Sequence, residues 1–263
     1  MKIALEFALV YPGVVLTLVS FIGCLVRWQI APADRQRTEW MIVLVLLSTI
    51  VTWIAQIGLT LMSPLLTWKL DLYFYAGDAL FHHPSFVIGR FVYRHYWLEV
   101  LLQIAYTCLP TITAATIALH FYKYRSELRR VLTAFALNLC VAPIVYCLVP
   151  VCGPVYAFPS FPNDPGRVHP YFVHINNAPP NGFPSVHFSS ALLILWALRR
   201  SRTTMAFGII YAILVFAATL ANGQHYLVDL FASVPYTALM VYWADRATSS
   251  SVAVELAYET RQA

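Results

Sequence analysis

The chain has 263 residues, of which 60% are hydrophobic and only 11% are charged, and its mean hydropathy is +0.67. Soluble domains carry about 25% charged residues, so this chain cannot cover a folded surface in water with polar groups. The composition excludes a soluble domain and predicts an all-α, polytopic membrane bundle that forms one integral membrane domain. The net charge of +5 falls mainly in short loops between apolar segments, so we expect no nucleic-acid partner.

Seven apolar segments follow one another along the chain, and six of them are about long enough to cross a bilayer. We expect spans at residues 5–26, 41–61, 97–121, 131–151, 205–221 and 226–244, and a shorter helix at 185–198. The segment 70–96 mixes aromatic and charged residues, which is typical of helices that lie along the membrane interface. The sequence thus predicts about six to seven transmembrane helices plus interfacial helices.

The basic residues indicate how the bundle is oriented. Twelve of the 17 lysines and arginines fall in the loops that follow the segments 5–26, 97–121 and 185–198 and in the C-terminal tail. Because cytoplasmic loops carry the excess of positive charge, this side is expected to be cytoplasmic. The N-terminus, the long loop at 152–184 and the motifs described next then face the extracytoplasmic side.

The long loop is rich in proline and glycine, which prevent helix formation and set rigid turns. Its aromatic residues argue against a flexible linker, so we interpret it as a structured lid over a cavity, with a plain connector as the alternative. Arg167, His169 and His174 lie in this loop and are candidates to contact a phosphate or a lipid headgroup.

Two short motifs place histidines at the start of apolar runs. Pro184 and Ser185 open the first run, so the unpaired amides of its first turn, those of Ser185 and Val186 included, form an anion site that His187 faces. In the second motif His225 and Asp229 are four residues apart and share a helix face. A carboxylate in that position can hold one ring nitrogen and leave the other as a nucleophile.

Polar residues that only bridge helix ends are the alternative reading of these motifs. Four signals favour catalysis: a shared membrane face, a helix N-terminus, a carboxylate at i+4 and the Pro-Ser-x-His start. Titratable groups in a membrane are costly, so their presence already indicates function. The motifs contain no cluster of carboxylates for a hard cation, and the five cysteines lack the spacing of metal ligands. We therefore expect neither a metal nor a cofactor.

The two motifs resemble the second and third signatures of the type 2 phosphatidic acid phosphatase superfamily. The resemblance implies that His225 accepts the phosphoryl group and that Asp229 orients the His225 ring. It also implies that His187 protonates the leaving oxygen and that Ser185 binds phosphate. It extends over about residues 70–244. Residues 1–65 are then expected to form N-terminal helices, 66–246 the catalytic core and 247–263 a cytoplasmic tail.

Two cationic elements of the family pattern are missing. The first signature, a lysine followed seven residues later by Arg-Pro, has no match, and Thr219 stands where an arginine is usual. In this the chain is similar to the sphingolipid phosphotransferase branch, which includes inositol phosphorylceramide and sphingomyelin synthases. Arg167, Arg90 or Arg94 could supply the missing charge, and we place Arg167 first because its loop leads into Ser185.

Three classes of function remain open at this stage. The first is a lipid phosphatase that works through a phosphohistidine, and we rank it slightly ahead of the second and well ahead of the third. The second is a lipid phosphotransferase that moves a phospho-headgroup to a lipid alcohol, and the third is a non-enzymatic transporter or scaffold. A membrane lipid is the expected substrate in the first two classes, and the oligomeric state cannot be read from the sequence.

Overall fold

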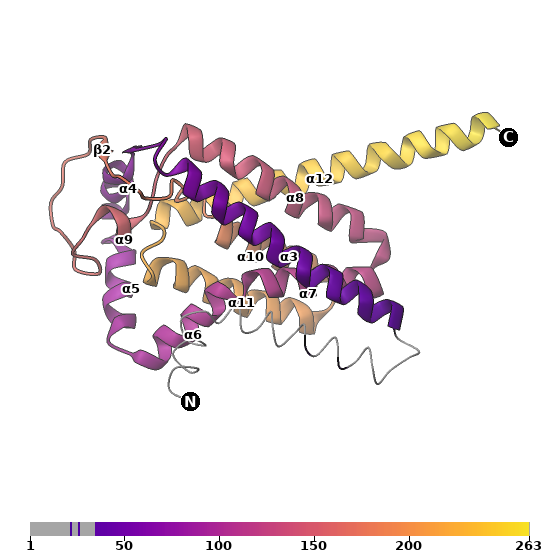
Figure 1. Ribbon diagram of the computed structural model, residues 1–263, viewed down its shortest axis with the longest axis horizontal. Helices are drawn as coiled ribbons and strands as arrows, with labels where there is room; N and C mark the ends of the chain where they lie inside the picture. Colours follow the sequence, from indigo (N-terminus) through magenta and orange to yellow (C-terminus); the bar gives the residue numbers. More distant parts are fainter. Residues whose placement is uncertain (1–21, 23–25, 27–34, 263) are drawn as a thin grey trace.

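The all-α architecture predicted from the composition is confirmed by a computed structural model, which describes residues 22, 26 and 35–262. Long helices run side by side, and short elements gather at one end of them (Figure 1). The long helices are α3 (Arg35–Met62), α6 (Tyr96–Thr107), α7 (Leu109–Lys123), α8 (Arg125–Leu148), α10 (Val186–Ala197), α11 (Arg202–Ala221) and α12 (Leu227–Gln262).

The short elements lie in two stretches of the chain. They are β1 (Trp68–Lys69), α4 (Asp71–Asp78), η2 (Ala79–Phe81), α5 (Pro84–Tyr93), α9 (Pro154–Ala157) and β2 (Val173–His174), and a further turn, η3 (Leu198–Arg200), follows α10. The segment expected to be interfacial is thus helical. The loop at 152–184 is joined to the start of this segment, because β2 in the loop pairs antiparallel with β1, which directly precedes the segment.

Several helices have the length and composition of membrane spans. In the described part of the chain these are α8, α11 and residues Leu227–Ser249 of α12, and a bent pair, α6 with α7, would make a fourth. The single span expected at 97–121 is therefore wrong in one respect, because the two helices meet at 50°. Pro110, the second residue of α7, has no N–H to donate, so the helical ladder is interrupted there. The span expected at 5–26 lies outside the described residues, apart from residues 22 and 26.

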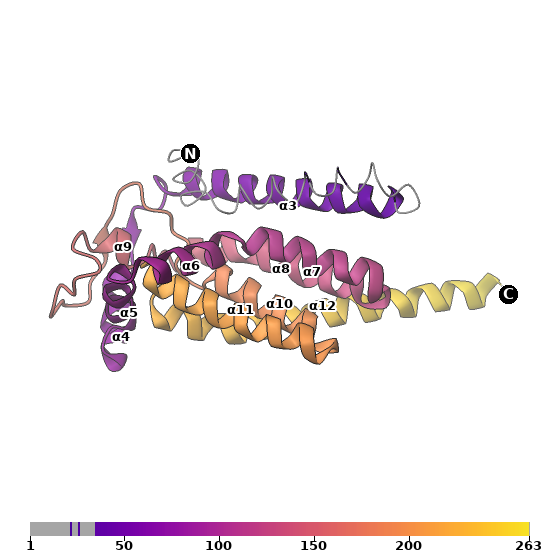
Figure 2. The same cartoon turned by 90° about the horizontal axis from the view of Figure 1, so that it is seen from below.

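Helix α10 lies at the centre of the bundle. It packs mainly against α11, α12 and α8, and four of its apolar residues, Ala191, Leu193, Ile194 and Ala197, are completely buried. A helix that is apolar all round belongs in such a position. Its 12 residues span about 18 Å, less than the hydrocarbon thickness of about 30 Å, so its N-terminus starts inside the bundle. Figure 2 shows α3 as a layer on one side, where it packs against α7.

The basic end of the bundle lies opposite the short elements. Arg130 of α8 pairs with Asp245 of α12, and Arg200 of η3 pairs with Glu127 of α8. Asp245 is 18 residues beyond the first residue of α12, which corresponds to about 27 Å along the helix. The two ends of the bundle are therefore separated by about the thickness of the hydrocarbon core.

A buried polar network links α8 to α10. The Asn138 amide donates to Ser190 Oγ at 2.9 Å, and its oxygen accepts from Ser189 Oγ at 2.7 Å. The Tyr236 hydroxyl of α12 donates to the Asn138 carbonyl at 2.9 Å. With few water molecules available at this depth, these groups must satisfy one another, and the network sets how α10 sits between its neighbours.

We expect the substitution Asn138→Ala to lower the free energy of unfolding by about 1 kcal/mol, because it removes two interhelical hydrogen bonds. Unfolding by denaturant in a defined detergent measures the change. Leu139→Ala is the matched control, since Leu139 is the next residue and is 40% exposed on the outer face of α8. An equal loss in both variants would mean that the polar network contributes no stability of its own.

Candidate active site

The N-terminus of α10 is built by Ser185. Its Oγ accepts a hydrogen bond from the Phe188 amide at 3.2 Å, which is the usual cap of a helix N-terminus. Its carbonyl accepts from the Ser233 hydroxyl of α12 at 3.2 Å, so the start of α10 is attached to α12. The Ser185 hydroxyl, expected to bind phosphate, is thus already used as a cap acceptor and retains only its proton for a ligand. The first-turn amides of Val186 and His187 remain available for an anion.

His187, the second residue of α10, is half-buried and is held by an aromatic neighbour from α6. Its ring stacks on Tyr106 with centroids 4.0 Å apart and an angle of 9° between the planes. The Tyr106 hydroxyl lies 3.3 Å from His187 Nδ1. The stacked ring and the nearby hydroxyl together hold the His187 ring in place.

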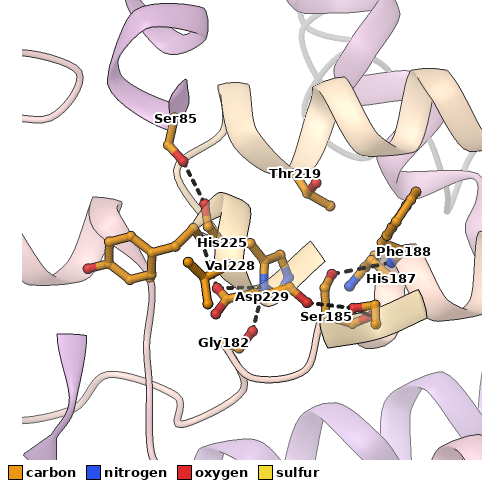
Figure 3. Close-up of polar contacts among 12 residues, drawn as sticks. Ser85, Gly182, Ser185, His187, Phe188, Thr219, His225, Val228 and Asp229 are labelled. Atoms are coloured by element: carbon orange, nitrogen blue, oxygen red, sulfur yellow. Dashed lines mark hydrogen bonds and ion pairs between the residues drawn. The ribbon is translucent and has the colours of Figure 1, made fainter. Parts of the chain in front are cut away.

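His225 lies in the turn between α11 and α12 and is 2% exposed. Its Nδ1 is 2.8 Å from the Gly182 carbonyl oxygen, which can only accept a hydrogen bond. Nδ1 therefore carries the proton, and the lone pair of the neutral ring is on Nε2. Figure 3 shows His225 and His187 in one region, with the contact from His225 to Gly182 drawn as a dashed line.

The position of Gly182 explains how its carbonyl reaches the ring. Its N–H donates to the Val151 carbonyl at 2.6 Å. A Cβ built on Gly182 would lie 2.7 Å from the Val151 side chain and 2.8 Å from its carbonyl oxygen. Only glycine allows this approach without a shift of the backbone.

Asp229 makes a different contact from the one expected. The sequence predicted that its carboxylate holds a ring nitrogen of His225, yet its Oδ2 is 3.7 Å from Nδ1, too far for a hydrogen bond. The same oxygen accepts the Tyr226 amide at 2.7 Å, which stabilises the turn after His225. The other oxygen, Oδ1, is buried and has no hydrogen-bond partner among the described residues. Asp229 is thus beside the imidazole as an electrostatic neighbour, while Gly182 makes the direct bond.

The environment of His225 keeps its ring neutral. Burial, and to a lesser extent the nearby His187, lower the pKa of His225 to about 3, although the Gly182 carbonyl raises it in part. A neutral imidazole is the nucleophilic form, because its lone pair is not occupied by a proton. At neutral pH the site therefore holds an uncharged imidazole with a free lone pair, next to a second histidine.

The position of the missing family arginine carries no charge. Thr219 is buried, and its hydroxyl donates to the Phe216 carbonyl at 2.8 Å in its own helix. Of the three replacement candidates, Arg167 and Arg94 are exposed and Arg90 is half-buried in the last turn of α5. The positive charge of Arg90 helps to lower the pKa of Asp164 in the long loop, behind larger effects from hydrogen bonds to that carboxylate. No contact is recorded between these arginines and either histidine, so their role stays a prediction.

Several residues that hold the site were not identified from the sequence. Asp71 and Asp78 were noted only as charges of the interfacial segment, but both are buried against the turn that carries His225. Their spacing of seven places both on one face of α4, which was the available signal. Nothing in the sequence marks Tyr106 or the Gly182 carbonyl, because these contacts depend on how distant segments pack.

Comparison with known families gives the class of this protein. The family model described as the PAP2 superfamily matches residues 74–243, which include both histidine motifs. The helical fold, the apolar spans and this match define a membrane protein of the lipid phosphatase type. The chain belongs to the PAP2 superfamily, the type 2 phosphatidic acid phosphatases.

Among solved structures, the crystal structure of Aquifex aeolicus LpxE matches with a TM-score of 0.48 and 16% sequence identity, over 62% of this chain and 92% of that chain. A search of curated proteins found no match.

We expect Arg167→Ala to lower kcat/KM for a lipid phosphate roughly 100-fold, as the loss of a transition-state donor does. Arg167→Lys should recover only part, because lysine cannot bind phosphate with two parallel hydrogen bonds. Release of inorganic phosphate measures both variants. Arg202→Ala, an exposed arginine at the basic end, is the control and should keep full activity. A silent Arg167→Ala together with a severe loss in Arg90→Ala or Arg94→Ala would move the cation to α5.

Proposed function

We propose that the protein is an integral membrane lipid phosphatase in which His225 Nε2 attacks the phosphorus of a lipid phosphate. The observation that carries this proposal is the 2.8 Å contact from His225 Nδ1 to the Gly182 carbonyl. It leaves the lone pair of a buried, neutral imidazole on the other nitrogen, at the end of the bundle where α10 begins. Phosphohistidine formation needs such a nucleophile and an acid for the leaving group.

The first step forms the bond from Nε2 to phosphorus and breaks the bond from phosphorus to the lipid oxygen. A bound phosphate favours the imidazolium form of His187, which gives its Nε2 proton to the departing oxygen while Nδ1 keeps its partner Tyr106. In the second step His187 takes a proton from water, the water oxygen bonds to phosphorus, and the N–P bond breaks. Inorganic phosphate and the lipid alcohol are the products.

Phosphate binding is proposed to rest on the start of α10. The amides of Val186 and His187 have no intrahelical partners, and the dipole of the helix is positive at this end. The proton of the Ser185 hydroxyl is a further donor. The negative charge that develops on the transferring phosphoryl group is stabilised by donors of this kind when they are already in position.

Lipid phosphotransfer is the second candidate, and Thr219 favours it. Without a cation at that position, the site is better matched to a phosphodiester of charge about −1 than to a monoester of about −1.5 to −2. In both cases the histidine attacks phosphorus, but the donor and the acceptor differ. Lipid phosphates and phospholipids incubated with and without lipid alcohols or inositol distinguish them, since transfer makes a new phospholipid and hydrolysis of a lipid phosphate makes free phosphate.

We expect His225→Ala to abolish phosphate release, and His187→Ala to slow it by about 10²- to 10⁴-fold, because general acid catalysis contributes this much. His187→Ala should still form a phosphohistidine when the leaving group is good. The assay is run in excess EDTA, where we expect activity to persist, because no group of metal-ligating side chains is found among the described residues.

His120→Ala is the matched control for folding, because His120 is equally buried but lies in the last turn of α7, where its Nδ1 bonds the Thr116 carbonyl. Full turnover in His225→Ala would refute the assignment of the nucleophile. Loss of activity on chelation, restored by magnesium, would point to a different mechanism.

The site is proposed to face the extracytoplasmic side. Support comes from the distribution of arginines: Arg130 and Arg200 form ion pairs near the end of the bundle where α7 meets α8, and the start of α12, which follows His225, lies at the other end (Figure 1). By the positive-inside rule the arginine end is cytoplasmic.

We expect Arg167→Cys, in a background without native cysteines, to react with a membrane-impermeant thiol reagent in intact cells. Arg167 is exposed in the loop on the side of the histidines. Arg125→Cys at the opposite end is the control and should be protected until the cells are permeabilised. Labelling of Arg125→Cys with protection of Arg167→Cys would invert the orientation and place the chemistry in the cytoplasm.

A further inference from the structure

The first turn of α12 is capped by a residue from a distant helix. Asp78, the last residue of α4, accepts the Leu227 amide at 2.9 Å on Oδ2 and the Val228 amide at 3.1 Å on Oδ1. These amides have no partner within their own helix. A helix cap usually comes from the residue at the start of the same helix. Tyr226, which stands there, has no short polar side chain to do this, and Asp78 replaces it with both oxygens at once.

The same short elements hold the two preceding residues. Asp71, one heptad before Asp78 on α4, accepts the Tyr226 hydroxyl at 3.0 Å, and it also binds the amides of Cys152 and Gly153 at 3.0 and 2.8 Å. The Ser85 hydroxyl of α5 donates to the His225 carbonyl at 2.8 Å. Each residue from 225 to 228 is therefore bonded to α4 or α5, and Figure 3 shows the bond from Ser85.

The chemistry of these contacts calls for carboxylates. Asp71 and Asp78 are 0% and 1% exposed, and burying an ionised carboxyl group is costly unless it is hydrogen-bonded. Burial raises the pKa of Asp78 to about 6, although its two amide partners lower it in part. An asparagine would offer one acceptor and would turn its NH₂ group towards the second amide. Only a carboxylate accepts both amides, and its charge also suits the positive end of the helix.

We propose that Asp78 is a positioning residue for the His225 nucleophile, with Asp71 and Ser85 as supports, so that α4 and α5 set where Nε2 meets the phosphorus. This inference rests on the phosphatase function proposed above. The His225 side chain is anchored by the Gly182 carbonyl, and its backbone is anchored through residues 225–228. A displacement of about 1 Å at a reacting atom can cost roughly 100-fold in rate, so loss of the backbone anchor should act on the chemical step.

The test is Asp78→Asn in the full-length protein, which keeps the shape of the side chain but removes one acceptor. We expect kcat to fall about 10- to 100-fold while KM changes little, because an interaction that matters only in the transition state is lost. Glu127→Gln is the matched control. Glu127 is also a buried carboxylate, 8% exposed, but it pairs with Arg199 and Arg200 at the basic end and should leave kcat unchanged.

Amide hydrogen exchange supplies a readout that does not depend on activity. The peptide covering residues 222–230 should exchange faster in Asp78→Asn than in the wild type, and at the wild-type rate in Glu127→Gln. If Asp78→Asn does not fold, Ser85→Ala is used in its place, because it removes only the hydroxyl contact to the His225 carbonyl. It should lower kcat and speed exchange of residues 222–230 in the same direction but by less.

Two outcomes would overturn the inference. One is unchanged kcat and unchanged exchange in Asp78→Asn. The other is a loss of activity in Asp78→Asn that is explained by its lower melting temperature, so that activity lost per degree is the same as in Glu127→Gln. Failure of the phosphatase proposal is recognised separately, because the wild type would then release no phosphate from any lipid phosphate, while the exchange experiment would still report on the anchor.

Discussion

The hydrogen bond between His225 Nδ1 and the Gly182 carbonyl is the contact on which the rest of the site depends. It joins the segments of the two histidine motifs, because Gly182 and His225 are 43 residues apart in the sequence. Gly182 can make it because its backbone lies against Val151, where any side chain would clash. The bond also decides which ring nitrogen is protonated, and so which one keeps its lone pair. The end of α8, the long loop and the start of α12 thus meet at one imidazole.

Backbone groups that leave a helix inside a membrane protein must find partners, since little water is present to satisfy them. In this chain the turn before α12 finds them in α4 and α5, which the sequence shows only as an interfacial segment. Asp71 and Asp78 each accept more than one donor, and the network of Asn138 with Ser189 and Ser190 fills the same need between α8 and α10. Some buried polar groups, such as Asp71 and Asp78, therefore hold the start of a helix, and others, such as Asn138, join neighbouring helices.

Charge is distributed unevenly between the two ends of the bundle. The basic end is held by ion pairs of Arg130 and Arg200 with carboxylates, whereas the described residues around the histidines include no cation in direct contact with either ring. Thr219, buried and bonded within its own helix, takes the place of the usual arginine. Under the proposed function, the amides at the start of α10 and a more distant cation would stabilise the phosphoryl group. The lack of an arginine at position 219 should therefore affect the preferred charge of the substrate more than any other property of the substrate.

The sequence by itself determined the class of fold, the approximate position of most helices and the two motifs, because apolar length and the 3.6-residue period are local properties. It also indicated that the helix at 185–198 is short, and the family match covers the motifs that it singled out. Only the tertiary structure decided that Gly182, rather than Asp229, bonds His225, that Tyr106 stacks on His187, and that the bend at Cys108 divides one expected span. These contacts join residues that are 43 and 81 positions apart. They depend on the angles at which helices pack, which no local pattern in the chain records.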